Sequence, residues 1–316
     1  MAQVVKMVDA MSKASLSQDE PQLLRREWGF LGQFRAMASP CEVLIACEDE
    51  AIAEQILLIA ANEARRIEAK YSRFIEGNAL WLLNHSQGQP HAIDDETYRL
   101  LLFAKQCFEL SDGKFDVSAG PLMALWRFDA TAKGTIPKVE DIARAKAYVD
   151  FSALQFTTSN VQIPLDMHLD FGGIAKEYAV DSAAQKLASR WPNISVLVNF
   201  GGDIACPIMR APPCSPWCVG IEDPYALDNA AAVLQIRQGA LATSGDTRRF
   251  IEYQGQRYGH IIDPSTGYPV KQAPRSVTVL AQHCVMAGML STMAMLKGAD
   301  AEAFLNEQGV SFQVFR

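Results

Sequence analysis

The segment Asp166–Asp181 restricts the possible folds more than any other stretch of the chain. Apolar side chains alternate up to Phe171, which predicts a strand, and the pair Gly172 and Gly173 ends that strand. From Ile174 onward, small and apolar residues recur at helical spacing, so a helix is expected to follow directly. This order of elements can bind an anion, because glycines let a ligand approach the backbone and the first helical turn has unpaired N–H groups.

A second glycine pair follows the predicted helix. The strand 195–200 ends in Gly201, Gly202 and Asp203, and we expect Asp203 to secure the backbone turn there. Lys176 lies in the first helical turn, where the helix dipole disfavours a cation, and a bound phosphate would remove that conflict. A tight turn with a solvated lysine is the alternative. The chain thus has two predicted strands that end in a glycine pair, with one helix between them. This repetition favours a ligand pocket lined by the backbone at both strand ends.

The composition is that of an ordinary globular protein. The chain has 316 residues, 49% hydrophobic and 21% charged, which suffices for one large domain or two modest ones. The net charge of −7 and the lack of a basic stripe with interleaved aromatic residues argue against nucleic-acid binding. No apolar run is long enough to cross a bilayer, so we expect no transmembrane segment.

Residues 1–25 are polar and contain neither the apolar core of a signal peptide nor a lipid-acceptor cysteine. We interpret them as a lead that is partly helical or disordered, and we predict a cytoplasmic protein. The seven cysteines favour the same conclusion, because their number is odd and most lie in apolar contexts typical of buried, reduced thiols. Cys214 and Cys218 form a C-x3-C pair without two further ligands nearby, so a metal site there has weak support.

Strands and helices alternate irregularly along the rest of the chain, and hairpins are frequent. The segments 250–253 and 257–262, for example, are predicted to pair across Gln254 and Gly255. The pattern favours an α+β fold with mixed or antiparallel sheets flanked by helices over a doubly wound parallel sheet. Residues 26–316 are expected to form one domain, either as a single unit or as two intertwined subdomains.

Five motifs occur in order along the chain: DGKFDVSAGPLMALW, LDFGGIAKEYAVD, VNFGGD, ATSGD and HIIDPSTGYP. Together they resemble the FAD:protein FMN transferase (ApbE) family, over residues 34–296. The resemblance implies an ApbE-like architecture, similar to the T-fold. It also implies a reaction that splits FAD at its pyrophosphate, transfers FMN to a Thr or Ser hydroxyl of a partner protein and releases AMP, with Mg²⁺ as cofactor.

The resemblance implies roles for individual residues. His260 corresponds to the general base that takes the proton of the acceptor hydroxyl, and a neutral imidazole suits that role near pH 7. An inert, hydrogen-bonded histidine beside a turn is the alternative, and the surrounding motif favours catalysis. Asp263 is interpreted as a turn-former. The expected FAD contacts are Met37 and Phe74 against the flavin nucleotide, Phe115 and Asp116 in the same cavity, Asp170 and Lys176 holding FAD with Lys176 near the phosphates, and Ile262 from the hairpin strand.

The implied metal site departs from the family pattern. Its backbone carbonyls map to Gly173 and Ser291 and its threonine to Thr292, but the aspartate position is Gly288. This matters because Mg²⁺ usually has one or two carboxylate ligands. Glu177 stands where the family usually has glycine; it either supplies a replacement carboxylate or is a solvated acid favoured by the helix dipole, and we expect the second. On this reading, Gly288→Asp should raise activity at limiting Mg²⁺.

Two other functions are compatible with the same motifs. One is a degenerate FAD-binding protein that holds the dinucleotide without turnover. The other is a pyrophosphatase that cleaves FAD to FMN and AMP with water as the acceptor. All three hypotheses predict FAD binding, and they differ in whether the flavin appears on an acceptor peptide, as free FMN or in neither form.

Overall fold

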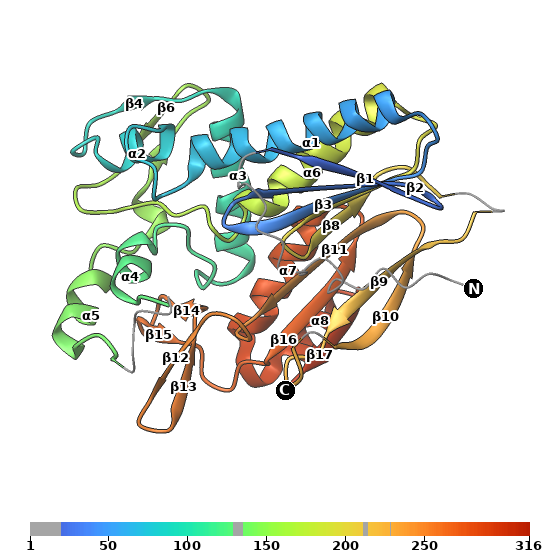
Figure 1. Cartoon of the computed structure of the whole chain (residues 1–316). Helices are drawn as coiled ribbons and strands as arrows, with labels where there is room; N and C mark the ends of the chain where they lie inside the picture. Colours follow the sequence, from blue (N-terminus) through green and yellow to red (C-terminus); the bar gives the residue numbers. More distant parts are fainter. Residues whose placement is uncertain (1–19, 129–134, 211–213, 228) are drawn as a thin grey trace.

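The structure is a computed structural model that describes residues 20–128, 135–210, 214–227 and 229–316. Within these ranges, eight strands form one sheet in the order β1-β2-β3-β7-β8-β11-β16-β17, and every neighbouring pair is antiparallel (Figure 1). The predicted α+β class is therefore confirmed. The strands are β1 (Gln22–Arg26), β2 (Gly29–Ala36), β3 (Ser39–Ile45), β7 (Val196–Phe200), β8 (Asp203–Cys206), β11 (Gly239–Gly245), β16 (Ser276–Ala281) and β17 (Ser311–Phe315).

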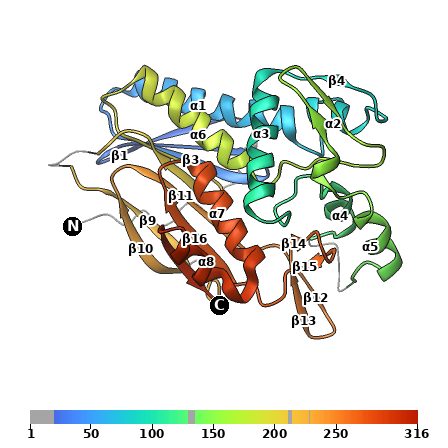
Figure 2. The same cartoon turned by 180° about the vertical axis from the view of Figure 1, so that it is seen from behind.

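Successive side chains of a strand point to opposite faces of the sheet, and both faces of this sheet carry buried apolar side chains. Val43 and Ile45 of β3 face the main core, whereas Leu44 faces a smaller core on the other side. Long helices cover the first face and the β9–β10 hairpin covers the second (Figures 1 and 2). These covering elements are α1 (Glu50–Tyr71), α6 (Ala175–Arg190), α7 (Cys284–Lys297), η2 (Gly298–Asp300) and α8 (Ala301–Glu307), with β9 (Trp217–Glu222) and β10 (Ala230–Ile236) opposite.

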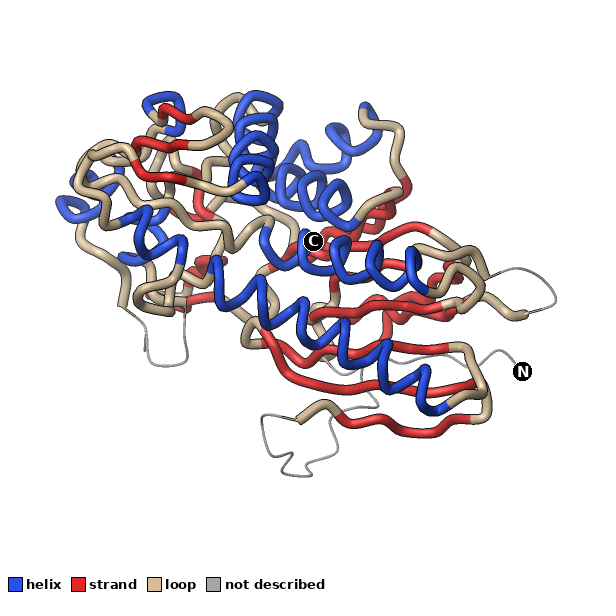
Figure 3. The backbone as a smooth tube through the Cα atoms, turned by 90° about the horizontal axis from the view of Figure 1, so that it is seen from above, coloured by secondary structure: helices blue, strands red, loops and turns tan. Residues whose placement is uncertain are grey.

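A second group of elements lies beside one end of this layered core (Figures 1 and 3). Its helices α2 and α3 pack into the main core. Another part of the group has a small hydrophobic core of its own, which joins Leu122, Trp126 and Ile142 to Ile251 and Ile262, far away in sequence. The Trp126 indole N–H also donates to the Gly267 carbonyl at 2.8 Å. The group comprises α2 (Ala79–Asn84), β4 (His91–Ala92), α3 (Asp95–Leu110), α4 (Gly120–Leu125), α5 (Val139–Lys146), η1 (Phe151–Ala153), β5 (Gln155–Phe156), β6 (Asn160–Gln162), β12 (Phe250–Tyr253), β13 (Gln256–Gly259), β14 (Ile262–Asp263) and β15 (Tyr268–Pro269).

Two sequence expectations need correction at this level. The polar lead was expected to extend through residue 25, but Gln22–Arg26 form β1, which pairs with β2; residues 1–19 of that lead lie outside the described ranges. The alternating residues before Phe171 were expected to form a strand. They are irregular, with one isolated bridge between Ala119 and His168, because their backbone groups bond to other loops.

The described residues also bear on cysteine chemistry and membrane spanning. All seven cysteines lie in the described part and are free thiols; five are buried, Cys47 is half-buried and Cys214 is exposed. Among the described helices, none combines the length and apolar character that a membrane span requires.

Candidate functional site

The first glycine corner is Gly172–Gly173, immediately before α6. The Asp170 N–H donates to the Val117 carbonyl at 2.7 Å, which explains why this segment does not pair as a strand. The Ile174 and Ala175 N–H groups both donate to the Phe171 carbonyl, at 2.9 and 2.8 Å, and turn the chain into the helix. No side chain caps the N-terminus of α6. The Ala175 N–H, the first of α6, is thus already bonded, and no capping side chain is bonded to the N–H groups that follow it in the first turn, as an anion site requires.

The second glycine corner is Gly201–Gly202, the turn between β7 and β8. Both residues have positive φ, 62° and 98°, a backbone region that favours glycine. A Cβ on Gly201 would lie 2.6 Å from Ser39 Cβ, so a side chain does not fit there. Ser39 follows the turn at Met37 and Ala38, whose φ angles are 52° and 54°. The hairpin that carries Met37 therefore packs against the second glycine corner.

Lys176 connects the two corners. Its Nζ lies 2.8 Å from Asp203 Oδ2 and 3.4 Å from the Gly201 carbonyl oxygen, to which it donates a hydrogen bond. Burial by itself lowers the pKa of Lys176, but the charges of Asp203 and Glu177 outweigh burial and raise the pKa above its ordinary value. Asp203 therefore does more than secure a turn. Its negative charge stabilises the Lys176 ammonium group, which the positive end of the helix dipole disfavours.

Asp170 and Phe74 are linked through Arg73, which the sequence interpretation missed. Arg73 Nη1 lies 3.0 Å from Asp170 Oδ2, while the Gly172 N–H donates to Asp170 Oδ1 at 2.8 Å. The Arg73 guanidinium also lies over the Phe74 ring, 4.7 Å from its centroid. Phe74 is 81% exposed, which is unusual for a large aromatic side chain and leaves its ring available to stack on a ligand. Arg73 and Phe74 are neighbours in the sequence, but the pairing of Arg73 with Asp170 could not be predicted from it.

Phe115 and Asp116 lie beside the first glycine corner in different ways. The Phe115 ring is 3.3 Å from the point that a Cβ on Gly173 would occupy, so the two are in contact. Asp116 accepts hydrogen bonds from the N–H groups of Ser118 and Phe151, at 2.7 and 3.2 Å, and burial raises its pKa. Its carboxylate holds two loops in place, which is a positioning contribution.

His260 lies directly after β13, with its ring 6.3 Å from that of Phe128 in an edge-to-face arrangement. Burial lowers its pKa to about 4, and the positive charge of Arg249 adds to this effect. The imidazole is therefore neutral at pH 7, and within the described residues its Nδ1 has no hydrogen-bond partner. The charge of Lys176 also acts on His260, which places both groups in one electrostatic environment.

The motif after His260 divides into a core residue and a turn. Ile262 belongs to β14 and is buried in the small hydrophobic core. Asp263 is a turn-former, as expected, because its carboxylate accepts from the Ser265 N–H at 2.8 Å and its carbonyl accepts from the Gly267 N–H at 2.8 Å.

Three of the four predicted metal-ligand positions, Gly288, Ser291 and Thr292, lie on α7, and the fourth, Gly173, precedes α6. The Ser244 hydroxyl on β11 lies 2.8 Å from both the Ser291 and the Thr292 hydroxyl, and Ser291 donates to the Gly288 carbonyl at 3.0 Å. Ser244 belongs to the ATSGD motif, but its contact with α7 could not be predicted from that motif. The structure thus brings Gly288, Ser291 and Thr292 together.

Glu177 packs against Gly288, which corrects the expectation of a solvated acid. Only 8% of Glu177 is exposed. A Cβ on Gly288 would lie 2.6 Å from Glu177 Cγ and 2.8 Å from its Oε1. Burial, followed by the negative charge of Asp203, raises the pKa of Glu177 well above its ordinary value. The glutamate therefore fills the space that a side chain at position 288 would need.

Asp181, on α6, contacts another helix. Its two carboxylate oxygens accept hydrogen bonds from the Cys284 and Val285 N–H groups, at 2.8 and 2.9 Å. It therefore caps the N-terminus of α7, to which no local side chain is bonded.

Replacing Asp181 by alanine is expected to lower the free energy of unfolding by about 2 kcal/mol, because two N–H donors of α7 lose a charged acceptor. Urea denaturation measures the change. Asp181→Asn is the matched control, with a smaller loss, since its amide oxygen still accepts one bond. Equal stability of Asp181→Ala and the wild type would show that the cap is not energetically important.

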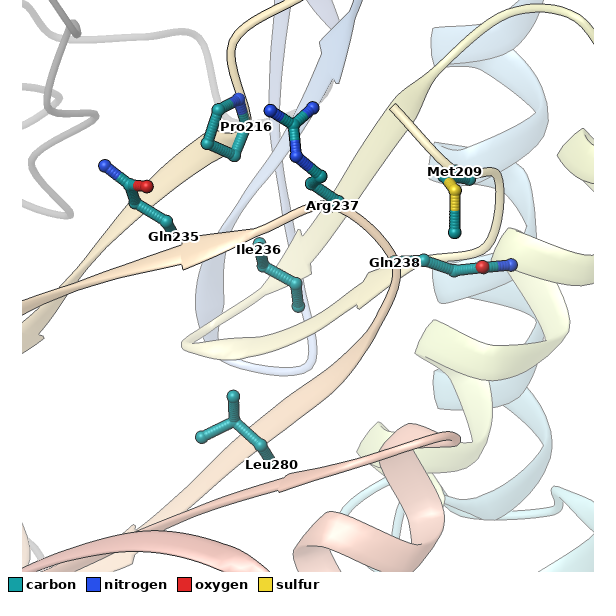
Figure 4. Close-up of a pocket in the computed structure, with 7 residues that line it drawn as sticks. All are labelled: Met209, Pro216, Gln235, Ile236, Arg237, Gln238 and Leu280. Carbon is teal, nitrogen blue, oxygen red and sulfur yellow. The ribbon is translucent and has the colours of Figure 1, made fainter. Parts of the chain in front are cut away.

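A surface hollow of about 500 Å³ lies elsewhere, beside β10 (Figure 4). None of the residues predicted for the flavin site lines it. Arg237 donates there to the Arg210 and Cys214 carbonyls, at 2.6 and 2.9 Å, so its guanidinium stabilises loop backbone. The hollow is lined by Met209, Pro216, Gln235, Ile236, Arg237, Gln238 and Leu280.

These features define an α+β protein in which two glycine corners, a lysine and an uncapped helix N-terminus form a candidate nucleotide-binding cradle. The sequence profile described as the ApbE family matches residues 37–314, and the chain belongs to that family.

Individual relatives agree with this assignment. An FAD:protein FMN transferase of Vibrio cholerae is 34% identical over 221 residues, covering 68% of this chain and 65% of that protein. The crystal structure of the ApbE protein from Thermotoga maritima has a TM-score of 0.82 and 29% identity, covering 93% of this chain and 94% of the other. The apo form of the Pseudomonas stutzeri flavinyl transferase ApbE has a TM-score of 0.79 and 26% identity, covering 95% and 92%.

Proposed function

We propose that this chain is an FAD:protein FMN transferase. In this reaction an acceptor Thr or Ser oxygen forms a bond to the FMN phosphorus of FAD. The bond between that phosphorus and the bridging oxygen breaks, and AMP leaves with the electron pair. The observation that carries the proposal is the connection of the two glycine corners by Lys176, in a chain whose relatives are named for this activity.

The diphosphate of FAD is assigned to the cradle. Lys176 and the first-turn N–H groups of α6 supply positive charge where the diphosphate carries negative charge. Phe74 offers an exposed ring for the isoalloxazine, and Met37 and Phe115 lie beside the second and first glycine corners respectively. Asp116 and Asp170 hold the loops that carry these side chains, and Ile262 supports the site from within the small core, where its side chain is buried.

His260 is assigned the role of general base. The acceptor hydroxyl is neutral at pH 7, so it needs a nearby group that takes its proton as the phosphorus–oxygen bond forms. An imidazole with a lowered pKa is available in its neutral form, and its Nδ1 is not committed to another described residue.

The residues around α7 fit a hard divalent cation such as Mg²⁺, which prefers oxygen ligands. The carbonyls of Gly173 and Ser291, the Thr292 hydroxyl and the Glu177 carboxylate are oxygen donors, and one Glu177 oxygen, Oε2, is buried without a hydrogen-bond partner in the described chain. When bound, the cation would neutralise charge on the non-bridging phosphate oxygens. Gly288 contributes no side chain to this set.

The decisive test mixes the protein with FAD, Mg²⁺ and a threonine-containing acceptor peptide and reads peptide mass. The proposal predicts a peptide heavier by one FMN and an equal amount of AMP. Free FMN with unlabelled peptide would instead identify a pyrophosphatase. Bound FAD without either product would identify a flavin carrier, and both results contradict the proposal.

A further inference from the structure

Glu177 is a buried acid with an unsatisfied carboxylate oxygen. It lies on α6, one residue after Lys176, and its Oε2 has no hydrogen-bond partner among the described residues. The charge of Lys176 favours the Glu177 carboxylate, but Lys176 is itself paired with Asp203 at 2.8 Å. The carboxylates of Asp203 and Asp181 act on Glu177 in the opposite direction. A buried carboxylate in this position costs free energy unless a further cation is bound or a proton is taken up.

Oxygen donors lie on α7, from Gly288 onward, and on β11. Glu177 is in contact with Gly288, and the Gly288 carbonyl accepts from the Ser291 hydroxyl at 3.0 Å. Ser291 and Thr292 both lie 2.8 Å from the Ser244 hydroxyl. Within the described ranges, no three His, Cys, Asp or Glu side chains are grouped so that they could hold a metal ion, so any cation held here takes a mixed set of carboxylate, hydroxyl and carbonyl oxygens. Such a set is typical of a hard divalent cation.

The geometry explains why the carboxylate comes from α6 and not from α7. A Cβ on Gly288 would lie 2.6, 2.8 and 3.0 Å from Glu177 Cγ, Oε1 and Cδ, so the two helices have room for one side chain at this contact. Glutamate at 177 and glycine at 288 satisfy that limit, and a glycine at 177 with a longer residue at 288 would satisfy it equally.

We propose that Glu177 is the carboxylate ligand of a divalent cation at the α6–α7 contact. The absence of a side chain at Gly288 leaves the room that the Glu177 side chain occupies. This inference rests on the proposed function for the identity of the cation. It reverses the expectation that Gly288→Asp raises activity at limiting Mg²⁺. The aspartate would overlap with Glu177 and bring two carboxylates together inside the protein, so the single variant is expected to be less stable and not more active.

The test measures metal binding directly, by calorimetric titration of Mn²⁺ and Mg²⁺ into the full chain. Glu177→Gln keeps the shape of the side chain and removes its charge, and we expect it to weaken Mn²⁺ binding at least tenfold. Mg²⁺ is expected to raise the melting temperature of the wild type and not that of Glu177→Gln. Glu302→Gln is the matched control. Glu302 lies on α8 and is paired with Arg316, so this variant should bind Mn²⁺ like the wild type.

The exchange variant Glu177→Gly/Gly288→Asp moves the carboxylate from one helix to the other and is expected to recover Mn²⁺ binding to within a few-fold of the wild type. Equal Mn²⁺ affinity of Glu177→Gln and the wild type would overturn the inference, as would a wild type that binds neither cation. FAD binding, followed by flavin fluorescence without metal, is read separately. Loss of FAD binding, or unlabelled peptide at saturating Mn²⁺, counts against the proposed transferase function and not against Glu177 as a metal ligand.

Discussion

Replacing Lys176 by methionine is expected to weaken FAD binding more than a hundredfold and to lower the free energy of unfolding by about 3 kcal/mol. The affinity falls because the cation assigned to the diphosphate is lost from both glycine corners. The stability falls because Asp203, which is 2% exposed, is left as a buried charge without its partner. Flavin fluorescence titration and urea denaturation measure the two effects.

Two control variants separate these effects. Lys176→Met/Asp203→Asn removes both charges, so it is expected to recover most of the stability and none of the FAD affinity. Lys186→Met removes another lysine of α6, whose partner is Glu63, and should leave FAD binding unchanged. Wild-type FAD affinity in Lys176→Met would show that the lysine serves only as the counter-ion of Asp203.

The variant His260→Ala is expected to lower the rate of FMN transfer by about 10² to 10⁴, the usual contribution of a general base, while FAD affinity changes only a few-fold. The reason is that the imidazole acts on the acceptor hydroxyl and not on the bound dinucleotide. Mass spectrometry of the peptide over time gives the rate. Added imidazole should restore part of the activity if the loss is chemical.

The pH profile provides an independent check on His260. Burial and Arg249 lower its pKa to about 4, so the neutral, proton-accepting form persists as pH falls from 8 to about 5.5. The transfer rate of the wild type should therefore show no fall near pH 6.5 from this group. A fall centred at pH 6.5 that disappears in His260→Ala would mean that the histidine is solvated during the reaction.

Local chemistry made the glycine corners and the helix α6 predictable from sequence. Gly201 and Gly202 end a short, mostly apolar strand, and the helix after Gly173 shows its spacing directly. The segment before Phe171 was mistaken for a strand because alternation reports burial on two sides, not pairing. Its Asp170 N–H bonds to a loop carbonyl of Val117, a contact that no local pattern encodes.

The partners of charged side chains were harder to predict. Glu177 was interpreted through the helix dipole, which favours an acid in the first turn, but packing against Gly288 on another helix determines its burial. Asp181 similarly caps a helix 103 residues further along the chain. The sequence did contain a signal, because Gly288 and Glu177 both depart from the pattern of the family that the chain resembles.

A crystal structure of this chain with FAD tests the central assignment most directly. We expect the diphosphate to lie within hydrogen-bonding distance of Lys176 Nζ, beside Gly172–Gly173 and Gly201–Gly202 and in front of the first turn of α6. A dinucleotide bound in the hollow beside β10, or a complex in which Lys176 contacts only Asp203, would contradict it.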